Sequence, residues 1–274
     1  MKVKFYGVRG SVPVCGPEFQ LFGGNTTCIC LTRENANRIA IIDAGTGIRN
    51  LGKELIARQY KQELIYISFT HFHWDHIQGF PFFAPAYDKN QKIGIHVMGS
   101  KRHFTNIHEI FSLMMRPEYF PVQLEEMGAQ FEFPNLGDQG IFFGARVSSI
   151  PQQHLTYGGS YALRIEDVSG SIVLCTDIEH GDTIDERIVE FAKNADMLIH
   201  DGQYTDEEYK KLRGWGHSTW KQAVEVAQKA NVKKLVITHH DPDHDDNFLI
   251  AMEKECKREF PNSVFAREGM EIAI

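Results

Sequence analysis

The sequence lacks several features that would by themselves assign it to a class of protein. Its 274 residues include only five cysteines, an odd number, so we expect no disulfide framework and predict a reducing compartment, the cytoplasm. No apolar run approaches the roughly 18–20 residues of a transmembrane helix, and the N-terminus lacks the apolar stretch of a signal peptide, so we expect no membrane partner. The formal net charge of −7 argues against binding to duplex DNA, but leaves room for a small nucleotide or a local RNA groove.

Internal repeats, low-complexity tracts and Pro/Ser-rich linkers are also missing, which favours a single domain spanning residues 1–274. Apolar, β-prone segments recur in both halves of the chain, with stretches of helical periodicity between them. The expected strands are 3–6, 26–32, 39–43, 64–69, 91–98, 129–133, 146–150, 161–165, 172–176, 197–200 and 234–238, and the expected helices are 48–56, 102–116, 184–193, 220–227 (capped by Ser218 or Thr219) and 246–260. Two strand-rich halves with interspersed helices predict an α/β fold in which two sheets pack together and helices lie outside.

Histidine, by contrast, is abundant, with thirteen residues. Four potential metal ligands fall within six positions: His71, His73, Asp75 and His76. Zn²⁺ accepts imidazole and carboxylate ligands, and Mn or Fe also suits such a set. The preceding residues 64–69 are apolar and β-prone, so these ligands lie on the loop that leaves a buried strand, a common place for catalytic groups. The sequence therefore predicts a metal centre, and we expect Zn²⁺ as its first candidate.

A centre with two metal ions needs more than four ligands, and three other expected strands end in suitable residues. His154 follows the strand 146–150, Asp177 follows 172–176, and His239 follows 234–238. His240 is the alternative to His239, which we prefer because it comes first after the strand. These residues complete a candidate set of seven ligands.

Residues 70–79 resemble the T-H-x-H-x-D-H-x-x-G signature of the metallo-β-lactamase superfamily. The resemblance implies a four-layer αβ/βα sandwich with the metal site at the sheet edge between the halves, and a homodimer is common in the family. It further implies how two divalent ions are held. The first ion is bound by His71, His73 and His154, the second by Asp75, His76 and His239, and Asp177 bridges the two.

Hydrolysis also needs a proton donor for the leaving group. His217 is our candidate, with Asp201 orienting its imidazole, and Asp75 completes the catalytic set. The segments around Asp201 and His217 resemble the paired H-E-A-T and H-S-T elements of RNase Z-like phosphodiesterases, with Asp201 in place of the usual Glu. Residues 7–13, 23–27 and 43–47 resemble bacterial cyclic-nucleotide phosphodiesterase-like hydrolases.

Two metal ions about 3.5–4 Å apart can hold one hydroxide between them as a nucleophile. We therefore expect a dinuclear metal-dependent hydrolase, a phosphodiesterase that cleaves cyclic nucleotides or small nucleotide phosphodiesters with a metal-bridging hydroxide. The alternatives are an RNase Z-like endoribonuclease, for which RNA is the substrate, and an acyl or thioester hydrolase using the same site. A nucleotide sensor on the same fold is a non-enzymatic alternative. We find no glycine- and lysine-rich insertion of the kind that grips tRNA in RNase Z.

Substrate contacts are predicted from two groups of residues. Arg9, Asn25 and Thr26 lie in glycine-rich loops and could bind a phosphate, although Arg9 could equally be a structural turn arginine. Four aromatic residues could stack on a base: Phe72, Trp74, Tyr119 and Phe120. For Phe72 and Trp74, packing in the core is an equal alternative.

Overall fold

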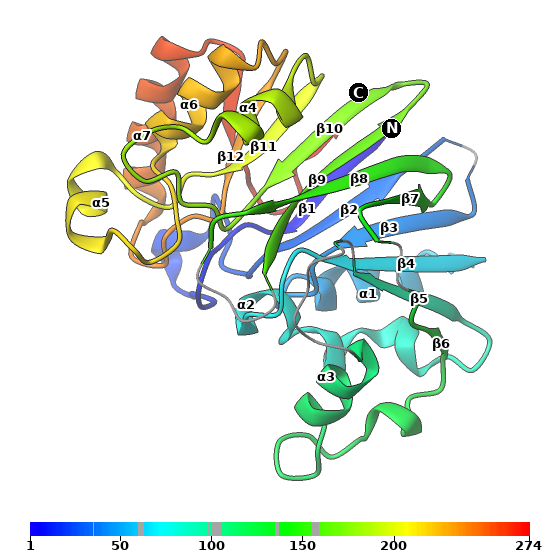
Figure 1. Ribbon diagram of the computed structural model, residues 1–274. Coiled ribbons are helices and arrows are strands. Elements are labelled where there is room, and N and C mark those ends of the chain that lie inside the picture. Colours follow the sequence, from blue (N-terminus) through cyan, green and yellow to red (C-terminus); the bar gives the residue numbers. More distant parts are fainter. Residues whose placement is uncertain (35, 60–62, 98, 100–105, 135–136, 155–158) are drawn as a thin grey trace.

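The computed structural model describes residues 1–34, 36–59, 63–97, 99, 106–134, 137–154 and 159–274. Two seven-stranded sheets pack face to face, and helices cover their outer faces (Figure 1). The predicted α/β sandwich of two sheets is therefore confirmed. Among the described residues, no helix is long and apolar enough to cross a bilayer.

The first sheet has an antiparallel and a parallel part. Its order is β14 (Glu271–Ala273), β1 (Lys2–Gly7), β2 (Cys28–Thr32), β3 (Arg38–Ile42), β4 (Leu64–Phe69), β5 (Lys92–Val97) and β6 (Gln130–Glu132). Strands β14 to β3 pair antiparallel, and β3 to β6 pair parallel. Parallel pairing places the carboxyl ends of β3, β4 and β5 at one edge of the sheet.

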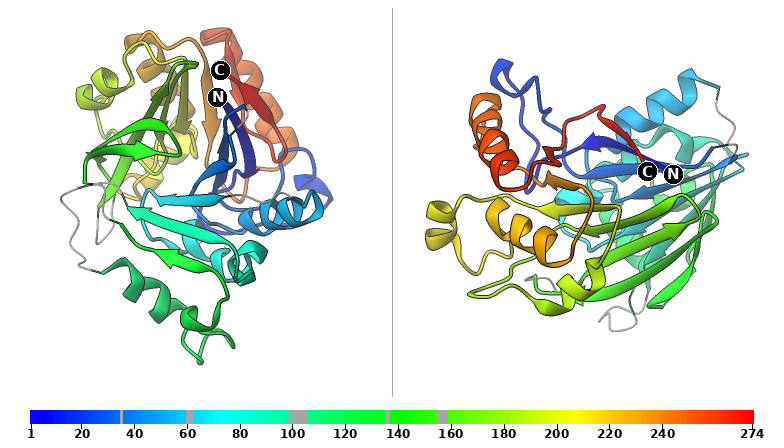
Figure 2. Two further views of the ribbon diagram at one scale, coloured as in Figure 1. Left: turned by 90° about the vertical axis from the view of Figure 1, so that its right-hand side faces the viewer. Right: turned by 90° about the horizontal axis from the view of Figure 1, so that it is seen from above.

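The second sheet is organised in the same way. Its order is β13 (Ser263–Phe265), β12 (Leu235–Thr238), β11 (Met197–Asp201), β10 (Gly170–Cys175), β9 (Ser160–Asp167), β8 (Ala145–Gln152) and β7 (Gln139–Phe142). Strands β10 to β13 pair parallel, whereas β7 to β10 pair antiparallel. Figure 2 shows the two sheets from the side and from above, with the two chain termini next to each other.

The core between the sheets follows from strand alternation. In β1, Val3 and Phe5 point to the second sheet and are fully buried, while Lys4 and Tyr6 point to the outer face. Buried residues of both sheets form one cluster there, including Ile42 of β3 and others such as Leu163, Leu174 and Ile199 of the second sheet. The interior is thus built from residues that lie far apart along the chain.

Helices bury their apolar faces against the outer sides of the sheets. On the first sheet these are α1 (Ile48–Ala57) and α3 (Ile107–Met114), and on the second α4 (Glu186–Ala192), α6 (Trp220–Lys229) and α7 (Asp246–Glu259). The predicted stripe of α6 is buried, and Thr219 is its N-cap in a capping box with Gln222. The short helix α2 (Trp74–Ile77) adds Ile77 to the core of the first sheet, whereas α5 (Asp206–Leu212) buries none of its residues. Of the helix predicted at 102–116, residues 102–105 lie outside the described part.

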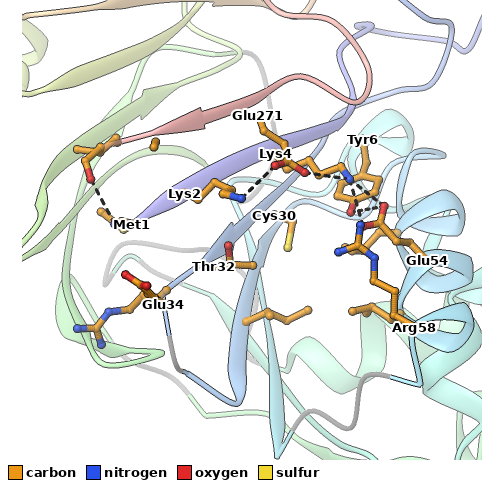
Figure 3. A pocket seen from close by; sticks show the side chains of 16 residues that line it. Met1, Lys2, Lys4, Tyr6, Cys30, Thr32, Glu34, Glu54, Arg58 and Glu271 are labelled. Carbon is orange, nitrogen blue, oxygen red and sulfur yellow. Dashed lines mark hydrogen bonds and ion pairs between the residues drawn. The ribbon is translucent and has the colours of Figure 1, made fainter.

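A pocket of about 630 Å³ lies on the outer face of the first sheet, between α1 and β14 (Figure 3). Lys4 Nζ lies 2.9 Å from Glu54 Oε2 and 3.3 Å from Glu271 Oε1, and the Tyr6 hydroxyl donates to Glu54 at 2.9 Å. Lys4 of this pocket is therefore paired with two of its carboxylates. None of the residues predicted to bind metal or substrate lines it.

Candidate metal centre

The predicted ligands come from strand ends of both sheets. His71 and His73 lie on the loop between β4 and α2, and Asp75 and His76 lie within α2. Asp177 and His239 come soon after β10 and β12 at the matching edge of the second sheet. Since carboxyl ends of parallel strands meet at one edge, residues more than 100 positions apart converge there.

The seven predicted ligands lie together in the structure. Their donor atoms form two groups within which all atoms lie within 4.8 Å of one another: His71, His73 and His154 in one, and Asp75, His76, Asp177 and His239 in the other. Asp177 approaches both groups, because its Oδ1 lies 3.6 Å from His71 Nε2 and 3.2 Å from His239 Nε2. This position matches that expected of a bridging carboxylate.

Several inward-facing atoms of the cluster have no hydrogen-bond partner. His71 Nε2, His76 Nε2 and Asp177 Oδ2 are buried and unpartnered among the described residues. His76 Nε2 and Asp177 Oδ2 are only 3.2 Å apart, yet their geometry is not that of a hydrogen bond. Buried polar atoms without partners are costly and rare. A divalent cation would satisfy them, and His/Asp donor sets suit such ions.

Outer hydrogen bonds fix how four of the imidazoles face the centre. In each case Nδ1 is engaged outside the cluster, which leaves Nε2 directed inward. The partners are Thr70 Oγ1 for His71 (3.1 Å), Asp43 Oδ2 for His76 (2.9 Å), the Gly216 carbonyl for His154 (2.8 Å) and Gln203 Oε1 for His239 (2.9 Å). His73 differs, since its Nδ1 faces inward, 3.1 Å from His154 Nε2.

The electrostatics of the cluster favour a bound cation. Burial alone would raise the pKa of Asp177, but the imidazoles of His239 and His76 outweigh it and hold that pKa well below its usual range. Burial lowers the pKa of His71 well below its ordinary value, so this imidazole is neutral at pH 7. Burial would also lower the pKa of His239, yet Asp177 and Asp75 raise it to about 9. The carboxylates are therefore ionised and attract positive charge.

The predicted catalytic pair lies beside this cluster. His217 Nδ1 is 2.8 Å from Asp201 Oδ2, and the rings of His217 and His239 stack with centroids 4.9 Å apart. Asp201 is fully buried at the end of β11, and its carboxylate also accepts hydrogen bonds from the backbone N–H groups of Asp177 and Gln203. The imidazole is thus held with Nδ1 toward the carboxylate, as predicted for a positioned proton donor.

The geometry distinguishes His239 from His240 as the last member of the candidate ligand set. His239 Nε2 lies 3.2 Å from Asp75 Oδ2, inside the cluster. His240 Nε2 instead donates to the Ala266 carbonyl at 2.9 Å, and its ring stacks on Phe265. His239 is therefore the member of the candidate ligand set.

The predicted phosphate-binding residues require a correction. Arg9 is fully buried, and its guanidinium donates to the backbone carbonyls of Gly23, Asp241 and His244 at 2.7–2.9 Å. The side chain of Asn25 donates to Glu268, and Thr26 Oγ1 accepts from the backbone N–H of Thr46. Arg9 and Thr26 are fully buried and hold loops together, which contradicts their prediction as substrate ligands. Asn25 is partly buried, and its role stays a prediction. Arg9 is the structural arginine of the alternative interpretation.

The four aromatic candidates divide into two kinds. Phe72 and Phe120 pack against the core of the first sheet, which leaves little of either ring for a ligand. Trp74 and Tyr119 remain exposed, at 64% and 74%. This second pair is the more accessible of the two.

Three supporting residues were not predicted from the sequence. Asp43 accepts from His76, Gln203 accepts from His239, and Glu179 accepts from the backbone N–H groups of Gly214 and Gly216, next to His217. Asp43 carries a usable signal, since it directly follows β3 as Asp177 soon follows β10. Gln203 and Glu179 carry none, because their roles depend on contacts with distant segments.

Comparisons with known proteins agree with this geometry. The family described as Beta-lactamase superfamily domain matches residues 38–240. Proteins named Ribonuclease Z from Picrophilus torridus and Methanosarcina acetivorans are each 25% identical, over 100% of this chain and 96% and 98% of their own lengths.

Solved structures show the same fold. The metallo-beta-lactamase fold protein YhfI from Bacillus subtilis superposes with a TM-score of 0.71 at 19% identity, over 99% of this chain and 98% of its own. The short form of human tRNase Z superposes with a TM-score of 0.68 at 19% identity, over 100% of this chain and 99% of its own. With the matched family region, these similarities show that the chain belongs to the metallo-β-lactamase superfamily and is a metal-dependent hydrolase of the RNase Z-like type.

Proposed function

We propose that this chain is a dinuclear metal phosphodiesterase that cleaves RNA. The observation that carries the proposal is the His217–Asp201 pair, which lies at the edge of a buried cluster of seven His and Asp donors. A nucleophile site and a proton donor side by side are what hydrolysis of a phosphodiester with a poor leaving group requires.

The donor groups suggest a division of labour. In this proposal His71, His73 and His154 would hold one ion, and Asp75, His76 and His239 would hold the other. Asp177 lies close to both groups and would be shared. Divalent ions bound there supply a nucleophile at neutral pH, by lowering the pKa of water to about 7, and polarise the phosphoryl oxygen. Zn²⁺ is the first candidate, and Mn²⁺ and Fe²⁺ suit the same donors.

His217 then serves the leaving group. Its Nδ1 lies 2.8 Å from Asp201 Oδ2, and this contact orients the ring. Nε2 is left to give a proton to the leaving oxygen. Asp201 is itself fixed by three backbone N–H groups, so the imidazole keeps one orientation through the reaction.

The choice of RNA rests on the relatives named Ribonuclease Z, which align with the whole chain. The sequence by itself favours cyclic nucleotides, and one observation keeps small nucleotide phosphodiesters as a second candidate. The alignment with the Picrophilus torridus relative spans 315 positions, more than the 274 residues here, so that relative carries segments without a counterpart in this chain. Release of a 3′ trailer from precursor tRNA, compared with hydrolysis of cyclic nucleotides, separates the two candidates.

The state of the cysteine thiols bears on the cellular compartment in which the protein works. All five cysteines are free, and four of them are buried. We infer that the enzyme works in a reducing compartment such as the cytoplasm.

The proposal is tested by combining metal analysis with hydrolysis of bis-p-nitrophenyl phosphate. We expect about two metal ions per chain and turnover by the wild type, consistent with a two-metal site. His217→Ala should keep its metal and lose roughly 10²–10⁴-fold in kcat, the usual contribution of a positioned general acid.

A matched control is His108→Ala, which removes a half-exposed imidazole on α3. This variant should keep wild-type turnover. Absence of any phosphodiester cleavage by metal-loaded protein would reject the proposed function. Unchanged turnover in His217→Ala would reject only the assigned proton donor.

A further inference from the structure

Two of the three tryptophans are exposed, which is unusual for so large an apolar side chain. Trp74 is 64% exposed and Trp215 is 65% exposed, whereas Trp220 is buried in the core under α6. In the described part of the chain, neither exposed indole stacks on another ring or donates a hydrogen bond. Both rings therefore offer free faces and a free Nε1–H.

Both tryptophans lie next to the metal centre. Trp74 stands between His73 and Asp75, at the first position of α2. Trp215 precedes Gly216, whose carbonyl accepts from His154 Nδ1 at 2.8 Å. His154 Nε2 also lies 3.1 Å from His73 Nδ1. His154 therefore contacts both the residue before Trp74 and the residue after Trp215.

The loop that carries Trp215 is held by a buried carboxylate. Glu179 is 5% exposed, and its two oxygens accept from the N–H groups of Gly214 at 2.8 Å and Gly216 at 2.9 Å, the residues on either side of Trp215. The Tyr209 hydroxyl donates to the same carboxylate at 2.9 Å. Both glycines have φ near +90°, which only glycine adopts cheaply. The loop tip is thus braced in a conformation that keeps the indole in solvent.

We propose that Trp74 and Trp215 stack on unpaired nucleobases adjacent to the scissile phosphodiester, with Glu179 as the residue that positions Trp215. This assignment rests on the proposed phosphodiesterase function and names its substrate class as single-stranded RNA. Every base has an apolar face, so aromatic stacking binds single strands with little sequence preference. Bases in a duplex are already stacked on one another and are not available to the indoles.

The experiment uses the metal-loaded full chain and three substrates. The first is a single-stranded oligoribonucleotide, the second is the same strand with abasic residues around the cleaved bond, and the third is bis-p-nitrophenyl phosphate. Trp74→Ala and Trp215→Ala should each lower kcat/KM for the base-bearing strand roughly tenfold or more, the usual effect of losing one stacked base. Hydrolysis of the abasic strand should change little.

Two further variants separate stacking from a general loss of structure. Trp215→Phe keeps an aromatic face and should recover most of the activity on the base-bearing strand. Glu179→Gln places an amide N–H₂ donor against one of the glycine N–H donors. We expect its kcat/KM to fall more on the base-bearing strand than on the abasic strand. Equal losses on both strands in the Trp→Ala variants would overturn the proposal.

Binding gives an independent readout. Since Trp220 is buried, quenching of indole fluorescence reports mainly on Trp74 and Trp215. The base-bearing strand should quench the wild type, and the abasic strand should not. Quenching without hydrolysis of any substrate would reject the proposed function and retain the stacking pair. Hydrolysis of RNA without a difference between the two strands, in quenching or in kcat/KM, would retain the proposed function and reject the stacking pair.

Discussion

At the scale of single residues, three strand ends of this chain share an uncommon backbone conformation. Asp43, Asp177 and His239 have φ of 61°, 58° and 62°, in the left-handed region that non-glycine residues seldom adopt. Such conformations cost about 1–3 kcal/mol each and persist where surrounding contacts hold them. Each of these residues points a side chain into the cluster or at one of its members. At these three positions the strained backbone therefore orients a side chain of the candidate site.

Asp43 gives a test at this scale. Its carboxylate accepts from His76 and from both the backbone N–H and the hydroxyl of Thr70. Asp43→Asn keeps the left-handed backbone, which Asn tolerates well, but replaces one acceptor oxygen by a donor. We expect a loss of roughly 10–100-fold in metal affinity or activity, as for other residues that orient a ligating imidazole.

Titration with metal under chelator buffering, followed by kcat, measures this loss. Asp88→Asn in an exposed turn is the matched control and should change neither quantity. An Asp43→Asn variant that binds metal like the wild type would show that Asp43 does not position His76.

At the scale of elements, the parallel strands collect the site at their carboxyl ends, and the rest of each strand provides the core. Strand β5 carries a buried polar residue, His96, in this core. His96 is 5% exposed, and its ring centroid lies 5.1 Å from those of both Tyr66 and Phe142. Neither of its nitrogens has a hydrogen-bond partner in the part of the chain that the structure describes. Burial lowers its pKa to about 4, so it is folded in as a neutral ring.

This burial predicts a pH effect with a definite sign. An unfolded histidine has a pKa of about 6.5, so the unfolded state binds the proton first as the pH falls. The contribution of neutral His96 is fully present above about pH 6.5 and is lost as the pH falls toward about 4. His96→Phe removes the titrating group and keeps an aromatic ring against Tyr66 and Phe142.

Urea unfolding of wild type and variant between pH 7.5 and pH 4.5 measures the difference. We expect the variant to lose less stability than the wild type across this range, while other titrating groups cancel in the comparison. Parallel curves for the two proteins would contradict a buried neutral His96.

At the scale of the whole molecule, one buried cluster joins residues from both sheets, and the metal centre closes the edge between them. This shared core supports the inference that residues 1–274 form one domain. The two halves also contribute ligands to the same groups: His73 and His154 in one, His76 and Asp177 in the other. Metal binding and the packing of the halves should therefore be thermodynamically linked.

Metal removal tests this link. A ligand that binds only the folded state stabilises it by an amount that grows with concentration, about 2.7 kcal/mol at 100 times Kd. We expect chelation to lower the unfolding midpoint, and added metal to restore it. Asp177→Asn should respond much less to either treatment, since Asp177 approaches both donor groups. Identical midpoints with and without metal would contradict the linkage.

The local pattern of apolar and polar residues was enough to predict many of the strands and helices of this protein. Strand Leu64–Phe69 has the predicted bounds, and α6 has the predicted buried stripe and cap, because alternation and helical spacing are properties of neighbouring residues. The strands β7, β13 and β14 and the helix α5 were not predicted. β13 and β14 have three residues each, too few for alternation, and α5 buries none of its residues, so it has no apolar stripe.

The candidate ligands were predictable for a related reason, since each follows a recognisable strand. Arg9 was not, because its guanidinium contacts carbonyls 232 and 235 positions away, and a glycine-rich loop gives no sign of such partners. Glu179 and Gln203 acquire their roles in the same way, from loops that meet only after the sheets have packed. The sequence by itself therefore determined most of the elements and the candidate metal-binding residues. The tertiary structure alone decided which polar side chains serve the scaffold and which serve the site, because that choice depends on contacts between segments far apart in the chain.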